Sequence, residues 1–266
     1  MATAKDRQSL AVWEEFHKSL LRGVEVDNSL TRQDIERQRA QLERDPIEWI
    51  KFFFPAYAKY EFAPFHIRAI RRVIANDEWY EVLSWSRELA KSTVAMFILM
   101  FLTLTRRKRF VALASATIDS AKRLLLPFKI NFESNPRIRQ FYGEQTTIGQ
   151  WTDSEFSCRC GAKFIALGAG SAPRGMRNEA IRPDILYFDD YDTDEDCRNP
   201  VTLDKKWDWA EHALYPTRSI SEPTLVLWCG NIIAKDCCIT RAGHLANSWD
   251  IVNIRDDAGR VRPLLP

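Results

Sequence analysis

The sequence has no long hydrophobic run, no internal repeat and no low-complexity linker. Its richest apolar stretch, residues 94–105, is too short and too close to charged residues to span a bilayer. The first twenty residues mix acids and bases with apolar positions, which predicts no signal peptide. A balance of 38 Lys and Arg against 36 Asp and Glu, with 45% hydrophobic residues, excludes a charged disordered chain. We therefore expect one substantial core, or one core plus a small appendage. We expect the six cysteines to be free thiols in a reducing compartment.

The near-neutral total conceals two segregated stretches of charge. Residues 101–141 hold nine Lys or Arg and two acids, whereas residues 184–196 hold seven acids and no base. A basic stretch suits a polyanionic partner, and an acidic stretch suits a divalent metal ion. Both can equally be solvated faces of the protein, so charge alone assigns no function.

The first sixty residues are predicted to be helical. Thr31 with Asp34 forms a capping-box pattern, and Asp45 before Pro46 is a second helix start. An earlier helix is predicted from apolar residues at helical spacing, namely Leu10, Trp13, Phe16 and Leu20.

Strands and helices alternate in the rest of the chain. Strands are expected over residues 81–85, 110–115, 151–157, 162–167, 185–188, 225–229 and 250–254, with a hairpin near Gly161. Helices are expected over residues 65–75, 92–104 and 207–214, and after Thr117. Strands separated by helices predict an α/β fold with a mainly parallel sheet flanked by helices. The predicted organisation is a helical extension over residues 1–60, a core over 61–257 and a linker over 258–266.

The first candidate site is the segment WSRELAKST, residues 85–93, between a predicted strand and a predicted helix. In a phosphate-binding loop, Lys91 would reach the β- and γ-phosphates and the Ser92 hydroxyl would bind Mg²⁺. Trp85 and Ala90 stand where that pattern has glycine, and we expect alanine at position 90 to require a negative φ. A lysine–serine pair at a helix start can also be purely structural.

The second candidate is ILYFDD, residues 185–190, an apolar strand that ends in two carboxylates. In this arrangement Asp189 would hold the Mg²⁺ hydration shell, and Asp190 would polarise the attacking water. The acidic run leaves Asp192 and Glu195 as alternatives for the second role, and acids here can also simply cap a helix. Asn231, after the strand predicted over residues 225–229, would sense the γ-phosphate or form a turn.

The order of these motifs resembles the ATPase domain of the large terminase subunit, the DNA-packaging motor of tailed bacteriophages. The resemblance covers roughly residues 61–257. Residues 86–93 are similar to the family's variant Walker A segment, which carries an early arginine, and FAPFH, residues 62–66, looks like its adenine-binding segment. The most specific match is GAGSAPRGMRNEAIRPDILYFDD, residues 168–190, in which an Arg-Gly loop precedes the Walker B segment, residues 185–190. The resemblance implies a P-loop (RecA/ASCE-like) core.

It also implies ATP and Mg²⁺ as cofactors and assigns roles to individual residues. The implied catalytic residues are Asp190, Arg87, Lys91 and Asn231. The implied nucleotide-binding residues are Ser86, Glu88, Leu89, Ala90, Lys91, Ser92, Thr93, Phe62, Phe65 and His66, although Phe65 can also be a core aromatic. Ser92 and Asp189 would bind the metal ion, and Arg177 or Arg174 would act on a neighbouring subunit as an arginine finger.

The implied activity is ATP hydrolysis that drives double-stranded DNA into a procapsid. The implied partners are the DNA, a homo-oligomeric ring on the viral portal and the small terminase subunit, in the host cytoplasm during virion assembly and without a membrane. We expect no nuclease activity, because residues 258–266 would only lead toward the family's absent C-terminal nuclease domain. The alternative is a degenerate P-loop module that binds nucleotide or DNA with little turnover, which Ala90 and Asp190 favour. Another P-loop enzyme, such as a helicase fragment, would share the fold.

Overall fold

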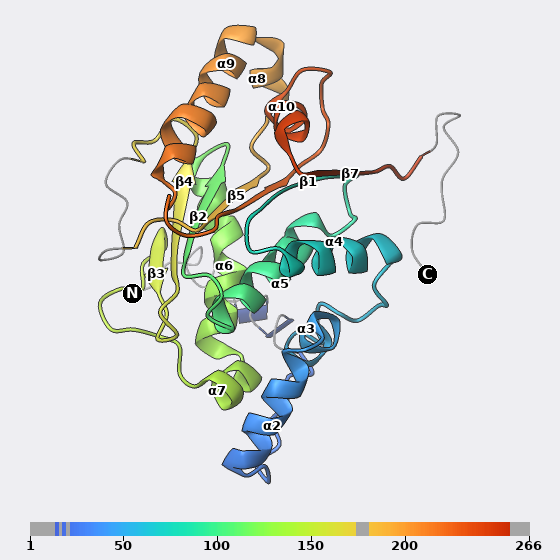
Figure 1. Cartoon of the computed structure of the whole chain (residues 1–266), viewed down its shortest axis with the longest axis vertical. Helices are drawn as coiled ribbons and strands as arrows, with labels where there is room; N and C mark the ends of the chain where they lie inside the picture. Colours follow the sequence, from blue (N-terminus) through green and yellow to red (C-terminus); the bar gives the residue numbers. More distant parts are fainter. Residues whose placement is uncertain (1–13, 16–17, 20–21, 174–180, 256–266) are drawn as a thin grey trace, which may run out of the picture.

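The computed structural model describes residues 14–15, 18–19, 22–173 and 181–255. These residues form one sheet with helices against both of its faces (Figure 1). The helix predicted at the start of the chain depends on Leu10, Trp13, Phe16 and Leu20, which lie outside the described residues.

Capping side chains define two helix starts near the N-terminus. Helix α2, Arg32–Leu42, follows Thr31, whose hydroxyl accepts the N–H of Asp34 while the Asp34 carboxylate accepts the N–H of Thr31, both at 3.2 Å. Helix α3, Pro46–Phe53, follows Asp45, whose carboxylate accepts an N–H of the first turn at 2.9 Å. Both predicted caps are confirmed, and caps of this kind contribute about 1 kcal/mol each.

A sheet of seven strands forms the centre of the described structure. The strands are β1 Trp79–Trp85, β2 Phe110–Ser115, β3 Glu155–Ser157, β4 Lys163–Gly168, β5 Ile185–Asp189, β6 Leu225–Cys229 and β7 Ser248–Val252. Their order in space is β3-β4-β2-β5-β6-β1-β7, and all neighbours are parallel except the hairpin of β3 and β4. The prediction of a mainly parallel α/β sheet flanked by helices is therefore confirmed.

The helices after α3 lie mostly between the strands in the chain. They are α4 Pro64–Ala75, α5 Lys91–Leu104, α6 Ile118–Ser134, α7 Pro136–Tyr142, α8 Asp194–Arg198, α9 Pro200–Asp208, the π-helix Trp209–Leu214, the 3-10 turn Tyr215–Thr217 and α10 Cys238–Leu245. The helix predicted over residues 207–214 is thus the end of α9 and the π-helix. Helix α6 begins after Thr117, as predicted, because its hydroxyl accepts an N–H of the first turn.

Alternating side chains of the strands build two hydrophobic cores. In β5, Ile185 and Tyr187 pack with helices α3 to α7, whereas Leu186 and Phe188 pack with α9, the π-helix and α10. This alternation follows from the two-residue period of a strand. Trp49 of α3 is fully buried in the first core and contacts Phe101 of α5, so α3 packs on the helices that cover the sheet. The division at residue 60 stays a prediction.

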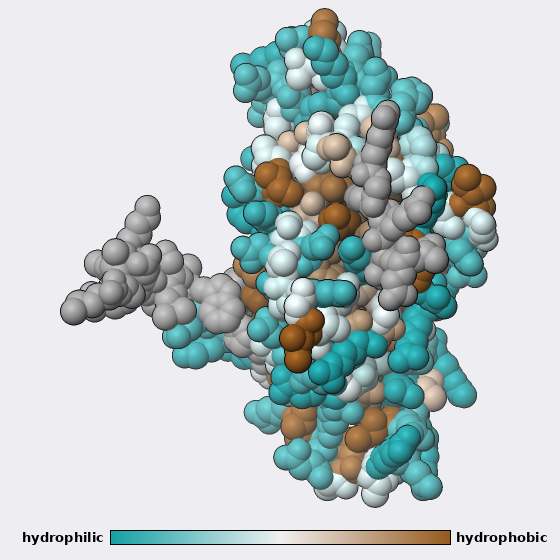
Figure 2. All heavy atoms as spheres, turned by 90° about the vertical axis from the view of Figure 1, so that its left-hand side faces the viewer, coloured by the Kyte–Doolittle hydropathy of each residue, from teal (hydrophilic) through white to brown (hydrophobic). Residues whose placement is uncertain are grey.

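Exposed hydrophobic side chains of the described residues are scattered over the surface (Figure 2). The face in Figure 2 is mostly hydrophilic, with hydrophobic residues in separate spots. Large hydrophobic side chains that are strongly exposed, such as Ile148 and Ile220, belong to different loops. No helix among the described residues is long and apolar enough to cross a membrane.

Candidate functional site

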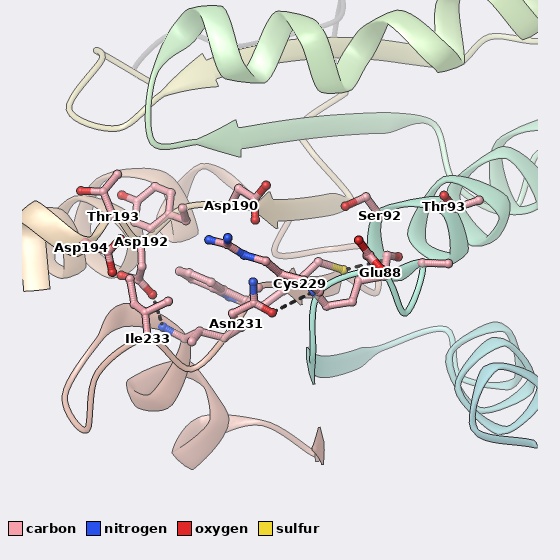
Figure 3. Close-up of a pocket in the computed structure, with 17 residues that line it drawn as sticks. Glu88, Ser92, Thr93, Asp190, Asp192, Thr193, Asp194, Cys229, Asn231 and Ile233 are labelled. Carbon is pink, nitrogen blue, oxygen red and sulfur yellow. Dashed lines mark hydrogen bonds between the residues drawn. The ribbon is translucent and has the colours of Figure 1, made fainter. Parts of the chain in front are cut away.

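A cleft of about 540 Å³ opens where strands β1, β5 and β6 end (Figure 3). Ser92 and Glu88 lie at one end of the cleft, Asp192 and Asp194 lie at the other, and Asp190 lies between them. The carboxyl ends of parallel strands are the usual ligand site of an open α/β sheet. Eight of the predicted site residues line the cleft, namely Arg87, Glu88, Ala90, Lys91, Ser92, Thr93, Asp190 and Asn231.

Helix α5 begins at the cleft without a capping side chain. Its N-cap residue Ala90 makes no side-chain hydrogen bond, and its first turn holds no acidic residue. The first N–H groups of an α-helix have no partner within the helix, and the helix dipole makes this end positive. An anion at this position would accept these N–H groups, as phosphate does in a phosphate-binding loop.

The loop before α5 is left-handed at two residues that are not glycine. Glu88 has a φ of 66° and Ala90 has a φ of 58°. The expectation that alanine at position 90 requires a negative φ is therefore wrong. The loop takes the conformation that glycine adopts freely, and a side chain there costs about 1–2 kcal/mol.

Lys91 joins this loop to the end of β6. Its ammonium group donates hydrogen bonds to the carbonyl oxygens of Trp85 at 2.8 Å and Ser86 at 3.3 Å, and to Oδ1 of Asn231 at 3.1 Å. Burial lowers the pKa of Lys91, and the Cys229 thiol and the carboxylates of Asp189 and Asp190 oppose this change. The structure thus brings together two predicted catalytic residues that are 140 positions apart in the sequence.

Asp189, the last residue of β5, is fully buried. The Tyr187 hydroxyl donates to its Oδ2, whereas Oδ1 has no hydrogen-bond partner among the described residues. Burial raises the pKa of Asp189 to about 7, although the hydroxyls of Tyr187 and Ser92 lower it in part. A buried carboxylate oxygen without a donor is rare in proteins. A cation beside it would supply the missing partner.

These groups fit a magnesium ion that is bound together with a nucleotide. Asp189 offers an unpaired oxygen, and the half-buried Ser92 hydroxyl lines the cleft nearby. Mg²⁺ at such sites keeps several waters and takes one or two protein oxygens plus substrate phosphates. It needs no complete protein cage, and the described residues contain no group of three His, Cys, Asp or Glu side chains that could hold an ion by itself.

Asp190 is exposed and lines the cleft, unlike Asp189 beside it. Its backbone is left-handed, with a φ of 44°. Of the two alternatives in the acidic run, Asp192 caps helix α10 by accepting the N–H groups of Cys238 and Ile239, each at 2.9 Å. Glu195 lines a neighbouring cavity. Asp190 is thus an exposed carboxylate in the cleft, and its role in orienting a water stays a prediction.

Of the three arginines with a predicted role, only one lies among the described residues. Arg87 is exposed and lines the cleft from the β1–α5 loop. Arg174 and Arg177 lie outside the described residues. A role for any of the three stays a prediction.

Two other predicted nucleotide-binding groups support the loop. His66 is buried, and its Nδ1 accepts the N–H of Ala63 at 3.2 Å, so its Nε2–H donates to the carbonyl of Leu89 at 3.0 Å. Burial lowers the pKa of His66, which favours this neutral ring. Phe65 packs on Trp85 with ring centroids 4.9 Å apart. Contact of residues 62–66 with adenine stays a prediction.

Sequence reasoning missed two contacts of the site. Tyr187 is two residues before Asp189 on the same strand, and residues at this spacing share a face. This spacing was a usable signal. Ser86 was expected to bind nucleotide, but its N–H donates to the carbonyl of Val252 at 2.9 Å and its hydroxyl accepts the N–H of Ile254 at 3.2 Å. Pairing with the end of β7 could not be predicted from local sequence.

No family model and no curated protein sequence matches the chain. Solved structures with a similar fold include the large terminase of bacteriophage HK97, at 13% identity and a TM-score of 0.48, with 80% of this chain and 44% of that chain covered. They also include Dbp5 of S. cerevisiae, bound to Nup159, Gle1, IP6 and ADP, at 10% identity and a TM-score of 0.47, with coverages of 81% and 52%. The chain thus spans about half the length of these proteins. At these identities and TM-scores the two likenesses carry no argument about the activity or family of this chain.

Proposed function

We propose that this chain is an ATPase domain whose cleft binds Mg-ATP and whose turnover moves double-stranded DNA. The observation that carries the proposal is the meeting of three groups in one place. Lys91 lies at an uncapped helix start, Asp189 is buried beside it with an unpaired oxygen, and Asn231 accepts a hydrogen bond from Lys91. Buried charged groups whose hydrogen bonds are only partly made within the protein are typical of a ligand-binding site.

The triphosphate would bind over the β1–α5 loop. The first residues of α5 line the cleft, and their N–H groups would donate to phosphate oxygens. Lys91 would exchange its hydrogen bond with Asn231 for one with a phosphate, because its other two acceptors are backbone carbonyls at the end of β1 and the start of the loop. Asn231 would thereby report on occupancy of the site.

Hydrolysis would use groups from the β1–α5 loop, the start of α5 and the end of β5. Ser92 and Asp189 would hold Mg²⁺, which neutralises phosphate charge when it is bound. Asp190 would orient the attacking water and accept its proton. Arg87, exposed at the same cleft, would add positive charge where negative charge develops in the transition state.

The coupling to DNA rests on the sequence resemblance to large terminases and on the basic stretch between the two Walker-like segments. By this resemblance the chain would act in a homo-oligomeric ring on the viral portal, with the small terminase subunit, and package DNA into a procapsid. A packaging motor must hold duplex DNA by its phosphates without reading bases.

A binding module with little turnover is the second candidate. The left-handed Ala90 and the short side chain of Asp190 both favour it. In that case the cleft would still bind nucleotide, but water would be positioned poorly.

Phosphate release with and without long duplex DNA separates the two candidates. A motor should hydrolyse ATP faster when DNA is present, and Lys91→Ala should abolish turnover. Lys59→Ala is the matched control, because Lys59 is exposed and lines a different cavity. Asp190→Asn should keep Mg-ATP binding and lose hydrolysis. Turnover in Lys91→Ala at the wild-type rate would contradict the assignment of the cleft, and nucleotide binding by the wild-type protein without turnover would favour the binding module.

A further inference from the structure

A second charged cavity lies at the amino ends of the parallel strands, on the side of the sheet opposite to the cleft at their carboxyl ends. It has a volume of about 480 Å³ and is bordered by the turn between α5 and β2, the segment before β5 and the loop before β6. These segments lead into the amino ends of parallel strands, whereas the cleft lies at their carboxyl ends. Since β2 and β5 have 6 and 5 residues, the two cavities are separated by about 15–20 Å.

Four arginines line this cavity, and three of them make no ion pair with a carboxylate among the described residues. Arg107 donates to the carbonyl of Ile74 at 2.7 Å and pairs with Asp77 at 2.9 Å. The other three, which we call the arginine cluster, make no ion pair and no side-chain hydrogen bond with any described residue. They are Arg106, Arg109 and Arg182, and all three are exposed.

The backbone that carries the arginine cluster is fixed by a buried carboxylate. Asp184 accepts the N–H groups of Arg109 and Phe110, each at 2.8 Å, and its own N–H donates to the carbonyl of Phe110 at 3.1 Å. These bonds hold the α5–β2 turn against the segment that bears Arg182. Binding a ligand would therefore require the ordering of side chains but not the assembly of the site.

The described acidic residues near the arginine cluster do not form ion pairs with it. Both carboxylate oxygens of Asp184 are occupied by backbone N–H groups, and this side chain is buried. Glu222 lines the cavity and is exposed, but it makes no ion pair with a described arginine. Ser219 and Ser221 add hydroxyl groups to the same wall. Guanidinium groups together with hydroxyls match the oxygens of phosphate.

We infer that the arginine cluster binds backbone phosphates of double-stranded DNA. This inference rests on the proposed function for the identity of the polymer, but it concerns a different surface from the nucleotide cleft. It also refines the expectation for the basic stretch, because Arg107 is already paired and the available charge is on Arg106, Arg109 and Arg182. Binding there reads no bases and depends steeply on salt.

The test is the affinity for a fluorescent 30-base-pair duplex over a series of salt concentrations. The triple variant Arg106→Gln, Arg109→Gln, Arg182→Gln should bind roughly tenfold or more weakly, and its slope of log affinity against log salt should fall by about 0.9 for each lost phosphate contact. The control with the same charge change is Arg32→Gln, Arg37→Gln, Arg44→Gln, on and after helix α2. Glu222→Gln should bind DNA more tightly than wild type.

The outcomes distinguish the arginine cluster from the proposed function. Wild-type binding with an unchanged affinity and slope in the triple variant would overturn the inference and leave the ATPase proposal standing. A wild-type protein that binds no duplex at low salt would contradict both. Inorganic tripolyphosphate, added when ADP fills the cleft, separates DNA from a free phosphate compound. If the triple variant loses saturable tripolyphosphate binding but keeps its DNA binding, the assignment to DNA is wrong.

Discussion

Replacement of Asp189 by asparagine should have opposite effects on the two properties that depend on this carboxylate. It should raise the free energy of unfolding and abolish ATP turnover. Without metal and nucleotide, burial raises the pKa of Asp189 to about 7, whereas an unfolded aspartate has a pKa of about 3.9. At 1.36 kcal/mol per unit, this difference corresponds to about 4 kcal/mol. Because the folded-state pKa is raised, the folded protein binds this proton more tightly, and stability from this group is lost as the pH rises from about 4 to about 7.

The Asp189→Asn variant has no carboxyl to ionise at this position. Its free energy of unfolding should exceed that of wild type by up to about 4 kcal/mol at pH 8 and should approach it near pH 4. The Tyr187 hydroxyl keeps an acceptor in the amide oxygen, so the hydrogen bond seen in the structure survives. ATP turnover should be lost, since the metal loses its carboxylate.

Urea unfolding at pH 5 and pH 8 in the presence of EDTA measures this difference. Asp194→Asn is the control, because Asp194 is an exposed carboxylate at the far end of the same cleft. A stability difference that does not widen with pH would refute the raised pKa. A variant that is less stable than wild type at pH 8 would show that the buried carboxylate already has a partner in the free protein.

Three further substitutions test the packing around the cleft. Gly243→Ala should lower the free energy of unfolding by about 1–3 kcal/mol, because a Cβ there would lie 2.3 Å from the Trp249 ring; an unchanged Tm would contradict this. Asp192→Ala removes the acceptor of two N–H groups at the start of α10 and should cost about 1–2 kcal/mol in urea unfolding, whereas a neutral effect would disprove the cap. Ala90→Gly should stabilise the protein by roughly 0.5–1 kcal/mol. Glycine relieves the left-handed strain at this position, and the greater entropy of the unfolded chain offsets part of this gain. A loss of stability would show that Ala90 is not strained.

Local signals in the sequence predicted most of the elements. The strands over residues 110–115 and 225–229 match β2 and β6, because short apolar runs between turn residues are local features. Caps such as Thr31 and Thr117 were also predictable, since a cap involves residues only a few positions apart. The last strand was predicted two residues too late, at 250–254 instead of Ser248–Val252. Element ends depend on pairing with a neighbour, in this case β1.

The sequence predicted which distant residues share the site, but not which of them contact one another. The motif order predicted that Lys91 and Asp189 would meet at one site, next to Asp190 and Asn231. The structure places Lys91, Asp190 and Asn231 at the cleft, whereas Asp189 is buried and does not line it. The motif order could not predict that Lys91 contacts Asn231 directly or that Asp189 lacks a partner for one oxygen, because both depend on how three strand ends align. The sign of φ at Ala90 was missed for a similar reason. A loop held at both ends by a strand and a helix imposes a conformation that its own residue would not choose.

Backbone strain occurs at the two places to which we assign binding. Among the described residues, four that are not glycine have a positive φ, namely Glu88, Ala90, Asp190 and Arg106. The first three line the cleft, and Arg106 belongs to the arginine cluster. Glycine would relieve about 1–2 kcal/mol at such a position, so a guanidinium held there at that cost is consistent with a functional role.

This reasoning predicts two effects of opposite sign for Arg106→Gly. The variant should unfold at a slightly higher urea concentration than wild type, because the φ of 60° suits glycine. It should also bind duplex DNA more weakly, with a salt slope smaller by about 0.9 if the side chain contacts one phosphate. Arg109→Gly is the comparison, since Arg109 has no positive φ and should lose DNA affinity without gaining stability. If Arg106→Gly gains stability and binds DNA as wild type does, the strained arginine has no part in DNA binding, and the arginine cluster loses one of its three members.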